Sequence, residues 1–270
     1  MKCNKYIPYG DISPWLSLCL EWFFDKSDFI PEIFPGTGNE ILFNLGDEMN
    51  VSVLKDNTTV SQTIIASGSA IIITPREYRV KFSSSRKIHF LTLRFKTAAF
   101  FDIFGIPVNL VKDCIISLND LNIDYPNINN LLINKTETLG EWLRKKISVK
   151  KNNELILLEP IERFYHNCNY DLLFGSVVFN KRTLQRKIHH HVGVDIRSLQ
   201  KNSRFQKAIK ELFKGRPLLN TILDYGFYDQ SHFIKNCVTY TSLSPKKLFT
   251  DQHITLNHYN VNTYIIAGYI

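Results

Sequence analysis

Several signatures of common protein classes are missing from this chain of 270 residues. The sequence has no run of about 18 apolar residues, the length that a membrane-spanning helix needs. Its first residues lack the apolar core of a secretory signal. The five cysteines are odd in number and none form a C-x-x-C pair, which argues against a disulfide scaffold and a zinc knuckle. These absences predict a cytoplasmic protein with reduced thiols and no membrane partner.

Catalytic and metal-binding patterns are equally scarce. The sequence has no G-x-S-x-G motif, and Gly36-Thr37-Gly38 is not followed by the Lys-Ser/Thr of a phosphate loop. The first half of the chain has one histidine, His89, whereas a metal-dependent barrel enzyme needs two or three with a carboxylate. We expect His89 to make an ordinary hydrogen bond in a strand, and Glu21, Glu32 and Glu40 to lie on the surface. The sequence therefore predicts no enzyme, no catalytic residue, no metal and no cofactor.

Positive charge is concentrated in the last third of the chain. The whole sequence has 33 Lys/Arg against 25 Asp/Glu, a net charge of +8. Cys168–Thr250 has 14 Lys/Arg against 5 Asp/Glu, or +9, and the remainder has 19 against 20. A neutral part followed by a basic part is typical of a sensing or scaffolding module joined to a nucleic-acid-binding module. A protein with a merely basic face would give the same balance.

The N-terminal part contains short segments rich in β-branched and aromatic residues, separated by turn residues such as Gly68 and Pro75. Strands this short at this spacing predict an antiparallel barrel or sandwich, here a barrel-like, cupin-like sensor domain in an α+β protein. The expected strands are Ile41–Leu45, Thr58–Ala66, Ala70–Thr74, Tyr78–Phe82 and Ile88–Phe95.

Helical patterns follow the strands. Thr97–Phe104 predicts a short helix that Gly105 and Pro107 end, and Ile128–Ile147 has an incomplete apolar stripe. That stripe could serve dimerisation, or it could be buried within one chain.

A basic stretch without aromatic residues, 146–153, predicts a linker with few contacts across it. The expected domains are therefore a regulatory domain at 1–148 and a second domain at 152–251. The tail at 252–270 is apolar and aromatic; its role is open, as an extra strand, a contact segment or a disordered end.

The second domain contains an internal repeat with an offset of 49 residues. Asn180–Ile188 matches Asp229–Cys237: both segments start with a good helix N-cap and carry apolar residues four apart. Leu218–Tyr225 followed by Gly226 precedes the second copy, and Asp171–Val178 precedes the first. A short helix, a turn and a capped second helix predict a helix-turn-helix in each copy.

A longer amphipathic helix, Arg197–Phe213, separates the two copies. Its 17 residues span about 26 Å at 1.5 Å per residue, which could hold two recognition helices roughly one DNA turn of 34 Å apart. Glu154–Asn167 predicts an opening helix that packs on the first unit. The pattern predicts an all-α domain that reads two successive major-groove segments.

Residues 152–251 resemble the DNA-binding domain of the AraC/XylS family of bacterial transcription regulators. The matching stretches are Arg182–Arg186, Arg204–Ala208, Tyr225–Phe233 and Leu243–Pro245. The N-terminal part resembles a regulatory domain found in some of these regulators, through Glu40–Gly46, Leu93–Phe95 and Phe104–Pro107. The resemblance implies a barrel-like sensor followed by seven helices, with helix-turn-helix units at about 171–191 and 218–240.

The sequence also departs from the family pattern. The first unit has no glycine in its turn, and several positions carry an unusual residue. These positions are Val178, Phe179, Ile196, Ile222, Cys237 and Ser242.

Residues near the start of a recognition helix reach base edges, where Arg can grip guanine and Gln can grip adenine. The expected DNA-binding residues are Lys181, Arg182, Gln185 and Arg186 of the first helix and Gln230, Ser231, His232 and Lys235 of the second. His232 could contact phosphate or could pack near its own N-cap. Lys207 and Lys210 lie away from the apolar stripe of the linking helix, which predicts phosphate contacts. The triplet His189–His191 is expected to form the exposed end of the first recognition helix, because three consecutive helical residues cannot face one ion.

The sequence therefore predicts a sequence-specific DNA-binding transcription regulator. Double-stranded promoter or operator DNA is the expected partner; the family resemblance adds activation and RNA polymerase, and a small-molecule effector and a homodimer are further expectations. The alternative is a small-molecule-binding barrel whose C-terminal module no longer binds DNA. The effector, the operator and the target genes cannot be read from the sequence.

Overall fold

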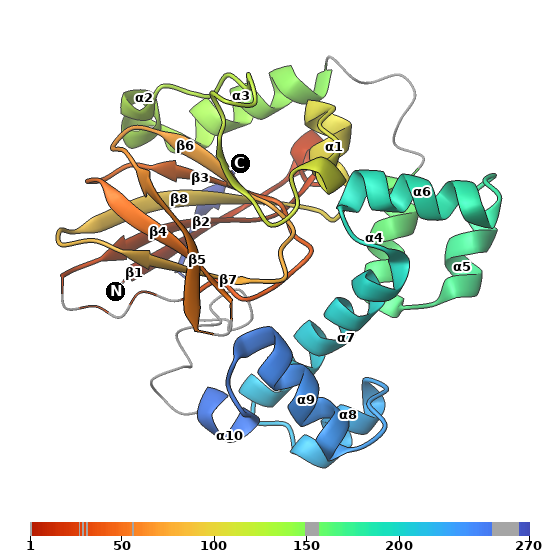
Figure 1. Cartoon of the computed structure of the whole chain (residues 1–270). Coiled ribbons are helices and arrows are strands. Elements are labelled where there is room, and N and C mark those ends of the chain that lie inside the picture. The colour runs from red at the N-terminus through yellow and green to blue at the C-terminus, as the bar shows by residue number, and fades with distance from the viewer. Residues whose placement is uncertain are drawn as a thin grey trace.

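The computed structural model describes residues 2–26, 28, 30, 32–55, 57–148, 157–249 and 265–270. A β-rich N-terminal part and an all-helical C-terminal part lie side by side (Figure 1). The strands form a three-stranded and a seven-stranded sheet, so the barrel-like arrangement predicted from the sequence is confirmed, although the barrel is not closed.

The seven-stranded sheet has the order β10-β1-β2-β8-β3-β6-β9, and all its pairings except β1 with β10 are antiparallel. Its strands are β1 Lys2–Ile7, β2 Leu16–Phe24, β3 Glu40–Asn44, β6 Ala70–Ile73, β8 Ile88–Phe95, β9 Ile115–Ser117 and β10 Ile265–Tyr269. The smaller antiparallel sheet has the order β5-β4-β7, formed by β4 Met49–Lys55, β5 Thr58–Ile65 and β7 Arg79–Ser83.

Both faces of the larger sheet are buried near its centre. Successive side chains of a strand point to opposite faces, so Leu42 joins the core between the two sheets while Ile41 and Phe43 join the core on the other face. This second face is covered by helices α1, α2 and α3 (Figure 1). The strand sequences are therefore nearly continuous apolar runs and not alternating ones.

The five strands expected from the sequence are all present within one or two residues, and β8 has the predicted bounds. Four others within the sensor, β1, β2, β4 and β9, escaped the sequence analysis. β4 does alternate, with Met49, Val51 and Val53 buried, and could have been found by that signal. β1 begins with exposed and half-buried polar residues and forms a strand because β2 and β10 pair with it.

The sensor helices are α1 Ala99–Phe104, α2 Ile128–Ile133 and α3 Lys135–Ser148, with single 3₁₀ turns at η1 Gly10–Ile12 and η2 Val108–Leu110. Gly105 ends α1 in the left-handed region at φ 71°, as the sequence predicts. The single helix expected over Ile128–Ile147 is wrong, because Asn134 breaks it into two. Most of the apolar stripe is buried within the chain, at Leu131, Leu139, Trp142, Leu143 and Ile147, whereas Leu132 is 44% exposed.

The end of the chain returns to the sensor domain as β10, which pairs with β1 in parallel. The Ile270 N–H donates to the Ile7 carbonyl at 2.9 Å, and the Ile270 carbonyl accepts from the Tyr9 N–H at 3.0 Å. Ile270 is buried in the core beneath the helices. Of the three alternatives for the tail, its last residues form the extra strand; 250–264 lie outside the described residues.

Within 157–249 the structure describes seven helices, the number that the family resemblance implies. They are α4 Leu158–Asn167, α5 Tyr170–Gly175, α6 Lys181–Val192, α7 Ile196–Phe213, α8 Leu218–Asp224, α9 Gln230–Thr241 and α10 Pro245–Leu248. Side-chain oxygens of Asn180, Asp195 and Asp229 accept from backbone N–H groups of α6, α7 and α9, as expected of N-caps, whereas Ser244 precedes α10 without a side-chain capping bond. The expected start of α4 at Glu154 falls outside the described residues.

The expectation of few contacts between the two parts is wrong. One continuous hydrophobic cluster joins sensor residues such as Phe100 and Val108 to Leu184, Ile188 and Val192 of α6. Linker composition carries no information about this docking, because the contacts come from α1 and η2, which are distant in sequence. Helix α3 also runs on to Ser148, into the stretch expected to be the linker, and 149–156 lie outside the described residues.

Replacing Asp229 by alanine should lower the free energy of unfolding by about 1 kcal/mol, the usual effect of losing an N-cap. Asp229 Oδ1 accepts from the His232 N–H at 2.7 Å, and this bond is lost in the variant. Asp229→Ser retains a capping oxygen and is the matched control. Urea unfolding of both variants checks the prediction, and equal loss in both would show that capping is not what Asp229 contributes.

Candidate nucleic-acid interface

The two recognition helices, α6 and α9, are built alike. Each buries a stripe of residues four apart against its own unit: Leu184, Ile188 and Val192 in α6, and Phe233, Cys237 and Thr241 in α9. Side chains on one stripe leave the opposite face of the helix to solvent. The tertiary structure thus places the two repeat segments in equivalent environments and gives each an outward face.

The outward face of α6 is cationic. Lys181, Arg182, Gln185 and Arg186 are all exposed. Lys181 Nζ lies over the Phe174 ring, 5.7 Å from its centre. No carboxylate among the described residues pairs with Arg182 or Arg186, so both guanidinium groups have their donors available for a ligand. The sequence-predicted residues of the first helix are therefore brought together on one face.

The outward face of α9 holds Gln230, Ser231 and Lys235, which are exposed as well. His232 is exposed but engaged: its Nδ1 accepts from the Tyr228 N–H at 3.3 Å and its ring packs edge-on against Phe227. The sequence left two roles open for His232, phosphate contact or packing near its own N-cap. The structure shows the packing near the N-cap.

Lys207 and Lys210 lie on the side of α7 that faces α4 and the sensor domain. The Lys207 ammonium donates to the carbonyl of His166, and burial lowers its pKa. Lys210 lines a groove together with Arg94 and Glu162. The two lysines therefore face other parts of this chain, whereas the outward side chains of α6 and α9 face solvent.

Comparison with known proteins matches residues 176–251 to the family described as "Helix-turn-helix domain". The match spans α6 to α10 and so includes both recognition helices. The chain carries an AraC-type helix-turn-helix domain. The resemblance to AraC/XylS transcription regulators is thereby confirmed over residues 176–251. No curated protein matches the chain.

Solved structures give distant likenesses in fold. ToxT from Vibrio cholerae is 14% identical with a TM-score of 0.47, and the match covers 85% of this chain and 96% of that chain. The structure of unsaturated fatty acid bound wild-type ToxT from Vibrio cholerae strain SCE256 is 17% identical with a TM-score of 0.44, covering 85% and 93%. The EutQ protein of Clostridium difficile is 16% identical with a TM-score of 0.26, covering 34% and 61%.

The departures from the AraC pattern are accommodated locally. Ser242 ends α9 at φ 55°, the left-handed conformation that explains why glycine is usual there. Ile222 and Cys237 are fully buried in the core of the second unit. Gly226 turns the second unit at φ 74°, whereas the first unit connects α5 and α6 without a left-handed residue and leaves Val178 exposed.

The histidine triplet does not form an exposed end of α6, which corrects the sequence-based expectation. His189 is exposed, but His191 is 6% exposed and its Nδ1 lies 3.2 Å from Oδ1 of Asp102 in α1. The rings of His190 and His191 both contact Phe101. The C-terminal end of the first recognition helix is thus held against the sensor domain by a buried polar contact.

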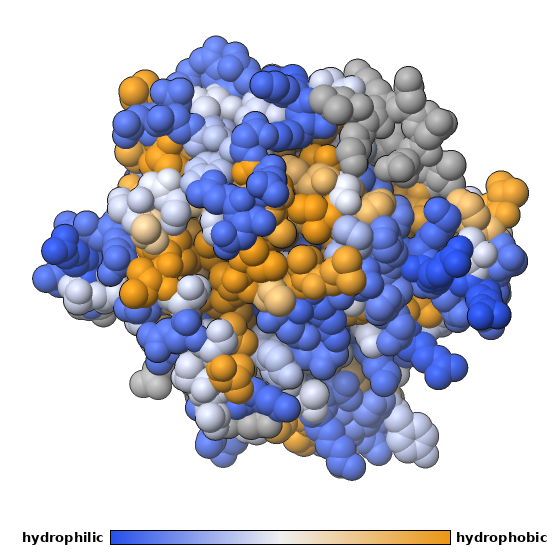
Figure 2. Space-filling view, turned by 45° about the horizontal axis from the view of Figure 1, so that its top comes forward, coloured by the Kyte–Doolittle hydropathy of each residue, from blue (hydrophilic) through white to orange (hydrophobic). Residues whose placement is uncertain are grey.

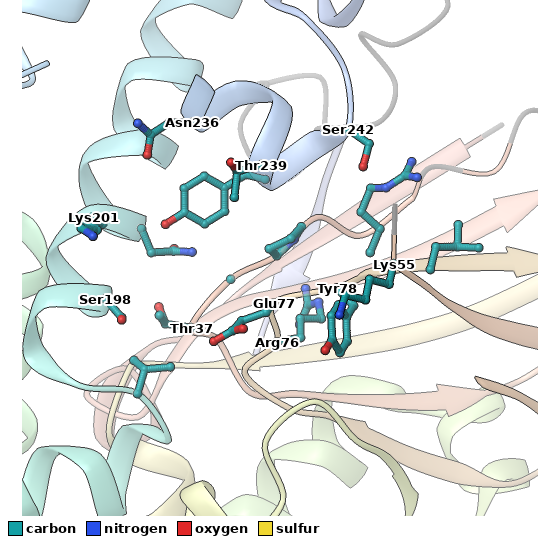
Figure 3. A pocket seen from close by; sticks show the side chains of 17 residues that line it. Thr37, Lys55, Arg76, Glu77, Tyr78, Ser198, Lys201, Asn236, Thr239 and Ser242 are labelled. Carbon is teal, nitrogen blue, oxygen red and sulfur yellow. The ribbon is translucent and has the colours of Figure 1, made fainter. Parts of the chain in front are cut away.

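A pocket of about 410 Å³ lies between the sensor and the AraC-type domain (Figure 3). Thr37, Lys55, Arg76, Glu77 and Tyr78 line it from the sensor, and Ser198, Lys201, Asn236, Thr239 and Ser242 from the helices. Sequence analysis could not find it, because its walls come from segments more than 100 residues apart.

The pocket has an excess of positive charge. Among the described residues its lining includes Lys55, Arg76, Arg79 and Lys201 and one carboxylate, Glu77, which pairs with Lys112 at 2.5 Å. Arg79 is held by Glu32 at 2.5 Å and Arg76 lies 3.9 Å from the buried Glu40, so the two lysines carry most of the uncompensated charge of the described lining. Such a lining favours an anionic ligand.

The sensor also buries two of the carboxylates expected on the surface. Glu21 is 2% exposed and Glu40 is 1% exposed. Glu21 accepts from Tyr6 at 2.7 Å, and its Oε1 lies 2.9 Å from Nε2 of His89 and 3.2 Å from Nζ of Lys135. His89 thus makes the ordinary hydrogen bond that the sequence predicts, but to a buried carboxylate.

Surface composition separates the two parts of the molecule. In Figure 2 apolar residues gather in a band over the sensor domain, whereas hydrophilic residues dominate the visible face of the helices.

The described residues contain no cluster of three His, Cys, Asp or Glu side chains fit to hold a metal ion. Within that same part of the chain, no helix is long and apolar enough to span a membrane.

Proposed function

We propose that the protein regulates transcription by reading two successive major-groove segments of one operator with α6 and α9. The observation that carries the proposal is the pair of equivalent helices, each with a buried stripe and an outward face of hydrogen-bonding side chains. Helix α7 joins the two units with 18 residues, about 27 Å of rigid rod, which suits grooves about 34 Å apart.

Each helix contributes its own contacts to this reading. Arg182 and Arg186 grip guanine edges, and Gln185 and Gln230 suit adenine, because these side chains match the base edges in bidentate fashion. The other proposed DNA-binding residues of the two helices are Lys181, Ser231, His232 and Lys235. Lys207 and Lys210 contact phosphates, for which Lys207 exchanges the His166 carbonyl for a phosphate oxygen.

The wider role follows from the AraC resemblance. The protein activates its target genes through RNA polymerase in the cytoplasm, acts as a homodimer, and has no catalytic activity. Residues 1–148 are its regulatory domain and 152–251 its DNA-binding domain. These statements rest on the family resemblance and on the division of charge along the sequence.

A small anionic molecule bound in the pocket between the two domains serves as effector in this proposal. The charge of Lys55 and Lys201 supports it, as does the contribution of both domains to the walls. A ligand there contacts both domains at once and so biases their relative orientation. A thermal-shift screen of small carboxylates and phosphates tests it, with Lys201→Ala expected to remove any stabilisation.

A gel-shift titration of the full chain against upstream genomic fragments tests the proposed function. Retained bands at moderate salt, with competition by specific fragments over bulk DNA, are expected. Folded protein that retains no fragment would refute the proposal and favour the alternative, a small-molecule-binding barrel with an inactive C-terminal module.

Arg186→Ala should weaken binding to the selected operator by about 1–3 kcal/mol and relax the preference at one base pair. Arg186 is exposed, so the fold is not at risk. The measurement is titration of matched and scrambled duplexes. Equal loss for both duplexes would mean that α6 does not read bases, and Arg197→Ala, an exposed arginine on another helix, is the control.

Lys207→Ala or Lys210→Ala should weaken all sequences alike. Each phosphate contact removed should lower the slope of log affinity against log salt by about one unit, because one fewer counterion is released. Binding measured across a salt series checks this. An unchanged slope would assign the two lysines to the groove beside the sensor domain instead.

A further inference from the structure

An apolar stripe lies on the outward side of the second recognition helix. Ile234 is 37% exposed and Val238 is 46% exposed. They lie four residues apart on α9, and Ile234 in turn lies four residues after Gln230. Exposed apolar side chains on a recognition helix can contact the apolar group that a base edge presents in the major groove.

Helix geometry places the stripe within the base-reading face. Ile234 and Val238 each follow a buried residue, Phe233 and Cys237, by one position, which turns them about 100° from the core. Lys235 lies about 200° from the core, so the stripe borders the polar side chains expected to enter the groove.

The opposite flank of α9 faces the sensor domain. Asn236 and Tyr240 line the pocket between the two domains, whereas neither Ile234 nor Val238 does. The stripe therefore lies on the flank of α9 that does not line this pocket.

The first recognition helix lacks the stripe, although it has the same buried positions. At the offset of 49 residues, Ile234 corresponds to Gln185 and Val238 to His189. One helix thus presents polar groups where the other presents branched apolar ones. Since thymine alone offers an apolar group, its 5-methyl, on the major-groove edge, this difference concerns which bases each unit accepts.

We propose that Ile234 and Val238 are specificity-determining residues that contact thymine methyl groups, so that the segment read by α9 contains thymines at these contacts and the segment read by α6 is selected by polar contacts. The inference rests on the proposed DNA-binding function. It makes the operator asymmetric, with the two units of one chain reading chemically different segments.

The test begins with duplexes selected from a random pool by the full-length protein. The segment whose base preference survives Arg186→Ala is the one that α9 reads. Thymines in it are then replaced singly by deoxyuridine, which removes only the methyl group. Each contacted methyl should cost the wild-type protein about fourfold in affinity, the value of one methyl group withdrawn from water.

Ile234→Ala and Val238→Ala should each lose this discrimination and bind the thymine and deoxyuridine duplexes equally at one position. Alanine is a strong helix former and both positions are exposed, so the helix is retained. Leu219→Ala, an exposed apolar residue of α8, is the matched control and should keep the discrimination.

Two results would overturn the inference while the proposed function stands. One is equal wild-type affinity for thymine and deoxyuridine duplexes. The other is unchanged discrimination in both alanine variants, with loss of transcription in a reconstituted assay, which would make the stripe a docking surface for a protein. If no duplex is enriched at all, the proposed function fails and the inference falls with it.

Discussion

Replacing His191 by alanine is expected to lower the free energy of unfolding by about 1–3 kcal/mol, the usual effect of removing one partner of a buried polar contact. Asp102 is 1% exposed, and His191 Nδ1 lies 3.2 Å from its carboxylate. The variant removes this contact, which is buried between α6 and α1 of the sensor domain. Urea unfolding at neutral pH measures the change.

Two further variants separate this cause from a general loss of helix stability. His189→Ala changes an exposed neighbour on the same helix and should alter the free energy of unfolding by less than about 0.5 kcal/mol. Combining Asp102→Ala with His191→Ala should recover part of the loss, since the double variant no longer buries a carboxylate that has lost its histidine contact. A double variant as unstable as the sum of both single variants would contradict the explanation.

The same contact has a functional consequence. It holds the end of α6 against α1 of the sensor, and so His191→Ala should loosen the first recognition helix from the sensor domain. Limited proteolysis of the full chain should then become faster than in the His189→Ala protein.

Acid should remove a second large contribution to the free energy of unfolding, which comes from Glu21. Burial raises the pKa of this carboxyl, but hydrogen bonds from His89, Tyr6 and Asn4 and the charge of Lys135 outweigh burial and lower the pKa from 4.5 to about 2. A pKa lowered this far corresponds to about 3 kcal/mol of stability, present above pH 4.5 and lost as the pH falls to about 2.

Glu21→Gln should therefore be less stable than the wild type by about 3 kcal/mol at pH 7, and the difference should shrink as the pH falls from 4.5 towards 2. Urea unfolding at a series of pH values measures both curves. Glu141→Gln, an exposed carboxylate on α3, is the matched control and should follow the wild type. A difference that stays constant with pH would show that Glu21 acts through packing and not through its charge.

Local patterns in the sequence determined most of the AraC-type domain. N-caps, apolar spacing and the 49-residue repeat are short-range signals, and each helix of the domain follows from residues within its own length. The exposed side chains of α6 and α9 could be assigned for the same reason, because helical spacing alone separates a buried stripe from an outward face. The stripe of Ile234 and Val238 was readable in this way as well.

Only the tertiary structure decided which distant segments meet. The burial of His191 against Asp102, the network around Glu21, the pairing of β10 with β1 and the pocket between the domains all join residues far apart in sequence. Spacing along a chain carries no information about such pairs, since their stability comes from desolvation and packing that exist only once both sides are folded. For the same reason the composition of residues 146–153 could indicate a linker but could not reveal that the helices on its far side dock onto the sensor.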